Sequence, residues 1–101
     1  MKELPKDIIN EMKTRFESDF NSANEILTEY LNEYDYLNSD LIIRCVIFLA
    51  DNRIESFKSF LESAKGDPRN VMWWAEYENR ESLDNNKRVR NFNKSFEKNK
   101  I

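Results

Sequence analysis

The chain of 101 residues lacks histidine altogether and contains one cysteine, one glycine and two prolines. Without histidine it has no side chain of the type that most often serves as general base or metal ligand near neutral pH. The lone Cys45 cannot form an internal disulfide or a thiolate-rich zinc site. One glycine cannot supply a glycine-rich phosphate loop. The composition therefore predicts a protein that is not an enzyme and has no catalytic residue, metal ion or cofactor.

The scarcity of glycine and proline also leaves little material for tight turns, while apolar residues recur at helical spacing along most of the chain. Together these features predict an all-α fold, a single compact domain of five to six short helices. The central helix is expected at about residues 39–50, because that run is apolar almost all round and must be covered on several sides.

No targeting or membrane segment is expected. Residues 1–12 carry charges throughout, and the most apolar run, residues 41–50, is about half the roughly 20 residues that a membrane span needs. Cys45 lies within this apolar run, which indicates a buried, reduced thiol. The sequence therefore predicts a cytoplasmic protein without a membrane partner.

Local signals set the expected helix boundaries. A first helix is expected over about residues 5–20. Ser22 followed by Glu25 fits a capping box, so the second helix is expected to start at Ser22. Further along, Gly66 is expected just past the end of a helix, and Asp67 with Pro68 fits the N-cap and first position of the next one.

Acidic residues dominate one long stretch. From residue 16 to residue 43 every ionisable side chain other than tyrosine is acidic, with no lysine or arginine. Glu25, Glu29 and Glu33 recur every four residues there, so on a helix they form one row of like charge that costs stability. Such a row is expected to face a basic partner. The acids between residues 35 and 40 do not match the spacing of an EF-hand loop.

Basic residues gather at the other end of the chain. Residues 84–101 hold six cations against two carboxylates, a net charge of +4. Because the whole chain has a net charge of -3, the remaining residues carry a net charge of -7. We expect residues 1–83 to form the helical core domain and residues 84–101 to form a basic C-terminal helix or tail. That tail has two open interpretations: it neutralises the chain's own acidic helix, or it contacts another molecule.

Aromatic residues offer further partner-binding candidates. Trp73 and Trp74 are adjacent, so on a helix they point about 100° apart and cannot both face one narrow core seam. One of them is expected either to wedge between helices or to anchor an interface. Tyr36 is expected beside the acidic row, whereas Tyr30 and Tyr34 fall on the apolar stripe.

Three segments, within residues 43–50, 64–71 and 73–77, resemble a known kind of protein. The run Ile43 to Ala50, the segment around Gly66-Asp67-Pro68 and the Trp73 to Tyr77 run resemble a pattern in small uncharacterised bacterial helical proteins. Some proteins of this kind are immunity proteins, which neutralise a toxin domain of a rival bacterium. The resemblance covers under half of the chain and implies helix packing and a partner class, but it assigns a role to no individual residue.

These observations predict a protein-binding domain, most concretely a cytosolic immunity or inhibitor protein that neutralises a basic toxin or nuclease through its acidic surface. The expected partner-binding residues are Glu25, Glu29, Glu33, Asp35, Tyr36, Trp73 and Trp74.

Two other functions stay open at this point. Apolar residues left over on the later helices could make a homodimer or a structural assembly contact. Arg88, Arg90, Lys94 and Lys98, interleaved with aromatic residues, could serve a nucleic-acid accessory, although the acidic body would repel a polyanion.

Overall fold

A computed structural model describes residues 4–33, 39–78 and 87–99 of the chain. Its elements in chain order are helix α1 (Lys6–Phe16), the 3-10 turn η1 (Glu17–Asp19), helices α2 (Phe20–Glu33), α3 (Asp40–Ala50), α4 (Ile54–Gly66) and α5 (Pro68–Glu76), and strands β1 (Tyr77–Glu78) and β2 (Lys87–Arg88). The two short strands pair antiparallel, with Tyr77 opposite Arg88. The prediction of a single compact and mostly helical globule is confirmed.

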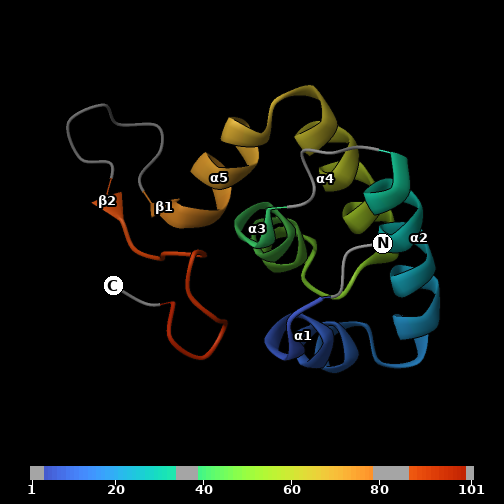
Figure 1. The fold of residues 1–101 in the computed structure, drawn as a ribbon. Coiled ribbons are helices and arrows are strands. Elements are labelled where there is room, and N and C mark those ends of the chain that lie inside the picture. Colours follow the sequence, from blue (N-terminus) through green and yellow to red (C-terminus); the bar gives the residue numbers. More distant parts are fainter. Residues whose placement is uncertain (1–3, 34–38, 79–86, 100–101) are drawn as a thin grey trace.

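Helix α3 lies at the centre of the molecule (Figure 1). It packs against α1, α4 and α5, as expected for a run that is apolar on nearly every face. Most of its side chains are buried, and the charged Arg44 is among them. The remaining helices each bury one stripe against this centre, such as Ile8, Met12 and Phe16 on α1.

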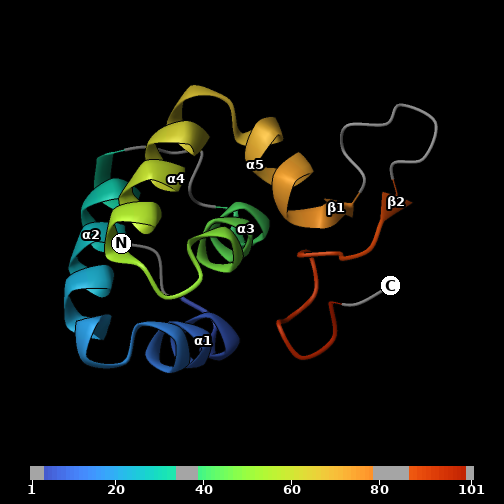
Figure 2. The ribbon, with the colours of Figure 1, turned by 180° about the vertical axis from the view of Figure 1, so that it is seen from behind.

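Helix α2 and the C-terminal segment, residues 87–99, lie on opposite sides of α3. Figure 1 and the reverse view in Figure 2 both place α2 at one end of the molecule and β2 with the following residues at the other. α2 packs against α1 and α4. The basic C-terminal segment described here therefore does not lie on the acidic helix.

The boundary between the first two helices differs from the prediction. α1 ends at Phe16, where Glu17 takes a positive φ of 49°, and α2 already begins at Phe20. Ser22 consequently lies inside α2 and starts no helix, so the predicted capping box is wrong. The reason is that η1 (Glu17–Asp19) leads directly into α2 at Phe20, so the helix has already begun before Ser22.

The junction between α4 and α5 is mostly as predicted. Asp67 is the N-cap of α5, its Oδ1 accepts a hydrogen bond from the Arg69 N–H at 3.0 Å, and Pro68 occupies the first turn. Gly66, however, is the last residue of α4 and has no positive φ. Asp67 ends α4 in an extended conformation and at once caps α5, so no left-handed glycine is needed.

The basic C-terminal segment forms no helix over residues 87–99, so the sixth helix that the prediction allowed for is not matched there. Instead β2 is followed by turns that press Phe92 into the core, where it is fully buried 5.3 Å from the Phe48 ring. Backbone hydrogen bonds to α5 take the place of helical ones. For example, the Val89 N–H donates to the Glu76 carbonyl at 2.8 Å. The predicted domain boundary at residues 83 and 84 lies outside the described residues.

A buried ion pair joins the N-terminal helix, the central helix and the C-terminal segment. Arg44 on α3 donates from Nε and Nη2 to the two carboxylate oxygens of Asp7 on α1, at 2.9 and 3.0 Å. Its Nη1 donates to the Phe92 carbonyl at 3.1 Å, and Asp7 in turn accepts the Phe96 N–H at 3.2 Å. The hydrogen bonds from Arg44 hold the pKa of Asp7 below its usual value, against the opposing effect of burial.

Glu76, at the end of α5, is a second carboxylate that holds the C-terminal segment, and it is fully buried. Its side chain is 2% exposed and accepts hydrogen bonds from Arg88 Nη2 at 3.2 Å and from the Phe92 N–H at 2.7 Å. Arg90 adds a hydrogen bond to the Ala75 carbonyl and lies 4.4 Å from the Phe48 ring centroid. The segment is therefore fixed by buried charge as well as by apolar contact.

We expect Asp7→Asn to lower the free energy of unfolding by about 3 kcal/mol at pH 7, because it leaves the buried Arg44 guanidinium without its counter-charge. A carboxyl whose folded-state pKa is depressed stabilises the fold above its unfolded pKa, about 3.9, and loses this contribution as the pH falls through the folded pKa. Urea unfolding measures the effect: the difference in the free energy of unfolding between Asp7→Asn and the parent protein should become smaller as the pH is lowered from 7 to 3.

Asp51→Asn is the matched control for this change. The Asp51 carboxylate also pairs with an arginine, Arg15, but its side chain is 78% exposed, so its loss should change stability by about 0.5 kcal/mol or less. Equal effects of the two substitutions, or a difference for Asp7→Asn that does not depend on pH, would contradict this assignment.

Candidate partner-binding surfaces

Three glutamates form the acidic ridge, which we define as Glu25, Glu29 and Glu33 on α2. All three side chains are exposed, while Ala23 and Leu27 on the same helix are buried. Residues four apart on a helix have their Cβ atoms about 6 Å apart, so the three carboxylates follow one line along the solvent side. The ridge is thus presented to solvent as the sequence predicted.

The acidic ridge has no counter-charge within residues 4–33, 39–78 and 87–99. No ion pair or hydrogen bond of these residues involves a ridge carboxylate. Elsewhere on α2 the Tyr30 hydroxyl hydrogen-bonds Glu62 of α4. Within the described part of the chain the ridge carboxylates are therefore not neutralised by a direct ion pair.

The position of the ridge on α2 adds to its cost. Two pairs of like charge stand four residues apart, and each such pair destabilises a helix by about 0.2 to 0.5 kcal/mol. Glu33 also lies at the C-terminal end of α2, where the helix dipole is negative and where the last turn has no basic residue. The ridge lowers the stability of α2 and makes no stabilising contact within the described residues, which points to a role in binding another molecule.

The two adjacent tryptophans have different surroundings. Trp74 packs against the core and contacts Phe60 edge-on at 6.2 Å between centroids. Trp73 is half-buried and stacks on Tyr77 with centroids 4.5 Å apart. Unlike Trp74, Trp73 does not pack against the core cluster, so it is the tryptophan that fits the interface role.

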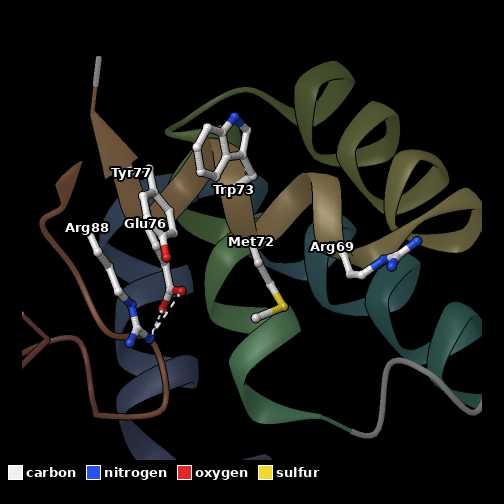
Figure 3. Close-up of a pocket in the computed structure, with 6 residues that line it drawn as sticks. All are labelled: Arg69, Met72, Trp73, Glu76, Tyr77 and Arg88. Atoms are coloured by element: carbon white, nitrogen blue, oxygen red, sulfur yellow. Dashed lines mark hydrogen bonds and ion pairs between the residues drawn. The ribbon is translucent and has the colours of Figure 1, made fainter. Parts of the chain in front are cut away.

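A shallow pocket of about 330 Å³ lies between α5 and the β1–β2 hairpin (Figure 3). Its lining residues are Arg69, Met72, Trp73, Glu76, Tyr77 and Arg88. Figure 3 shows Glu76 and Arg88 joined by their ion pair on one side and Arg69 extending away on the other. Trp73 therefore belongs to a concave surface and not to the acidic ridge.

The structure does not bring the predicted partner-binding residues into one surface. α5, with both tryptophans, lies beyond α3 and α4 from α2 in both views (Figures 1 and 2). Asp35 and Tyr36 lie outside the described residues. The acidic ridge and the pocket at Trp73 are accordingly two separate candidate sites.

Some basic residues of the C-terminal segment are engaged in contacts within the protein. Arg88 pairs with Glu76, and Arg90 is held against Phe48, whereas Lys94 and Lys98 are exposed. Phe92 is fully buried and Phe96 packs against the core. Phe92 is thus unavailable for stacking on nucleic-acid bases and Phe96 is only partly exposed, which weakens the aromatic half of the argument for a nucleic-acid accessory.

Sequence reasoning missed the two carboxylates that hold the C-terminal segment, the buried Glu76 and the partly buried Asp7. Glu76 directly follows the buried Ala75 and lies four residues after Met72, so it falls on the apolar stripe of its helix. Asp7 gives no such signal, because an acid in the first turn of a helix is ordinary. The signal for Asp7 was Arg44, a cation in an apolar run that needs a buried partner.

Other classes of site find little support in the described part of the chain. Cys45 is buried, and desolvation raises the pKa of its thiol, so the reactive thiolate is disfavoured. Among residues 4–33, 39–78 and 87–99 no three metal-binding side chains cluster together. None of the helices described has the length and hydropathy required to cross a bilayer.

Comparisons with protein-family models, with characterised proteins and with solved structures find no match to this chain.

We expect Glu29→Lys to raise the free energy of unfolding by about 0.5 to 1 kcal/mol, because it replaces two repulsive pairs in the ridge by two attractive ones. Lysine and glutamate have similar helix propensities, and Glu29 is exposed, so packing is unchanged. Urea unfolding at low and high salt measures the effect, which should shrink as salt screens the charges. A destabilised variant would show that the ridge has a structural partner.

Proposed function

We propose that this chain is a protein-binding domain that recognises a cationic protein through the acidic ridge. The observation that carries the proposal is that Glu25, Glu29 and Glu33 are exposed, aligned and unpaired in the described residues, while the basic C-terminal segment is held at the other end of the molecule. The alternative in which the chain neutralises its own ridge has no support from residues 87–99.

The most concrete form of this function is a cytosolic immunity or inhibitor protein directed against a basic toxin or nuclease. A nuclease needs a cationic surface to hold phosphates, and a row of carboxylates on a rigid helix can occupy that surface in their place. Inhibition would follow from exclusion of the nucleic acid. Long-range attraction between the two charged surfaces would speed association at low ionic strength.

Rigidity supports the same assignment. α2 is anchored by the buried Ala23 and Leu27 and packs against α1 and α4, so the backbone positions of the ridge glutamates are fixed before any partner arrives. A preformed surface loses less conformational entropy on binding than a flexible acidic tail would. The chain therefore suits tight and specific capture of one partner more than general attraction to basic proteins.

A homodimer is the competing interpretation, and the solution mass discriminates between the two. The proposal predicts a monomer of 12.2 kDa whose ridge is open. A stable dimer that covers α2 would favour the structural alternative.

The binding experiment uses a charge-matched pair of variants, Glu29→Lys at the centre of the ridge and Glu97→Lys on the C-terminal segment. Both residues are exposed glutamates without an ion pair in the described part of the chain, and both changes add the same charge. Proteins that the tagged parent chain retains from extracts of its own host are identified, and their affinities are measured with the purified chains.

We expect the ridge variant to bind the retained partner at least about 10-fold more weakly and Glu97→Lys to stay within about twofold, because like charges placed opposite each other cost several kcal/mol. The triple change of Glu25, Glu29 and Glu33 to Lys should abolish binding. A partner that is acidic, or one that binds the triple variant as tightly as the parent, would refute the proposed surface.

A further inference from the structure

The pocket between α5 and the β1–β2 hairpin has an aromatic wall that the core does not use. Trp73 and Tyr77 stack on each other with ring centroids 4.5 Å apart, whereas the Met72 side chain points away from the Trp73 ring and packs against the core (Figure 3). The two aromatic side chains offer a flat apolar surface to a ligand ring. The wall therefore suits a planar apolar group.

The opposite side of the pocket holds hydrogen-bond donors that the protein leaves unused. Arg88 donates only from Nη2, to the two carboxylate oxygens of Glu76 and to the Asn91 side chain. Its Nε is also without an acceptor but is buried, so no ligand can reach it, and no described residue engages its Nη1. The two N–H donors of Nη1 are therefore the ones left for an incoming carboxylate.

Charge does not oppose an anion. The one carboxylate among the lining residues, Glu76, is already satisfied by Arg88 and by the Phe92 N–H. Arg69, the second arginine of the lining, pairs with Asp67 outside it. No unpaired carboxylate of the lining is therefore left to repel an anion.

We propose that this pocket is a binding site for a small organic anion, a carboxylate attached to a flat apolar ring. The volume of about 330 Å³ is at the lower end of the range for ligand pockets, about 300 to 1,000 Å³, which fits one ring and one carboxylate. The ring lies along Trp73 and the carboxylate accepts from Arg88. The site is independent of the acidic ridge, because α2 lies at the other end of the molecule.

Phenylacetate is the probe, with phenylacetamide as its neutral counterpart and acetate as the control without a ring. The indole N–H signals of Trp73 and Trp74 in proton-nitrogen NMR spectra report on the pocket and on the core respectively, and the variants Trp73→Gln and Trp74→Phe assign them. We expect phenylacetate to shift the Trp73 signal saturably, with a Kd on the order of 1 mM for a ligand of this size.

The two controls and one variant decide the outcome. Phenylacetamide and acetate should each bind at least about 10-fold more weakly, and Arg88→Lys should weaken phenylacetate similarly, because lysine keeps a charge beside Glu76 but lacks the planar fork. Trp74→Phe and the triple ridge variant should bind phenylacetate like the parent. Equal binding of the acid and the amide, an equal shift of Trp74, or no saturable shift at about 20 times that Kd would overturn the proposal.

Discussion

The buried ion pair between Arg44 and Asp7 is the interaction on which the arrangement of the whole chain depends. Arg44 lies in the most apolar helix of the protein and is 9% exposed, so its charge must be compensated inside the fold. Asp7 supplies that compensation from α1, and both residues then hydrogen-bond the backbone of the C-terminal segment at Phe92 and Phe96. One cation thereby joins three segments that are far apart in sequence.

The distribution of charge over the molecule follows from this constraint. The C-terminal segment is held beside α5 and the first turn of α1, where Glu76 and Asp7 bind its backbone and where Glu76 also binds Arg88. Its Arg88 therefore neutralises the buried Glu76 at its own end of the protein, while Asp7 is neutralised by Arg44, and α2 is left uncompensated within the described residues. The acidic ridge at one end and the exposed Lys94 and Lys98 at the other give a molecule with opposite charges at its two ends.

Much of the fold could be predicted because helical periodicity and capping are local. The central helix and the Asp67-Pro68 start of α5 were visible in the sequence for this reason. The conformation of segment 87–99 could not be predicted in this way, because it is set by contacts with Asp7 and Glu76, which are distant in sequence. In addition, Val89, Phe92 and Phe96 have the spacing of a helical stripe although they form no helix. The capping box at Ser22 failed since the preceding turn, η1, leads directly into α2.

The candidate site was predictable to a similar extent. Exposure of the ridge could be inferred, because charged residues opposite an apolar stripe face solvent. Which tryptophan joins the core depends on where α4 places Phe60, and the pocket depends on a hairpin between β1 and β2 that local sequence does not signal. The separation of the ridge from Trp73 is a property of the packing of α3 and α4 and could only come from the structure.

The most direct test of this account locates the C-terminal segment relative to α2 in solution. A nitroxide attached to Cys at position 94, after Lys94→Cys, broadens nearby amide NMR signals, and the buried Cys45 thiol should escape labelling. The account predicts strong broadening of the first turn of α1, which contacts Phe96 through Asp7, and of the end of α5, with residues 25–33 retaining their intensity. Strong broadening of residues 25–33 would place the basic segment on the acidic ridge and contradict the account.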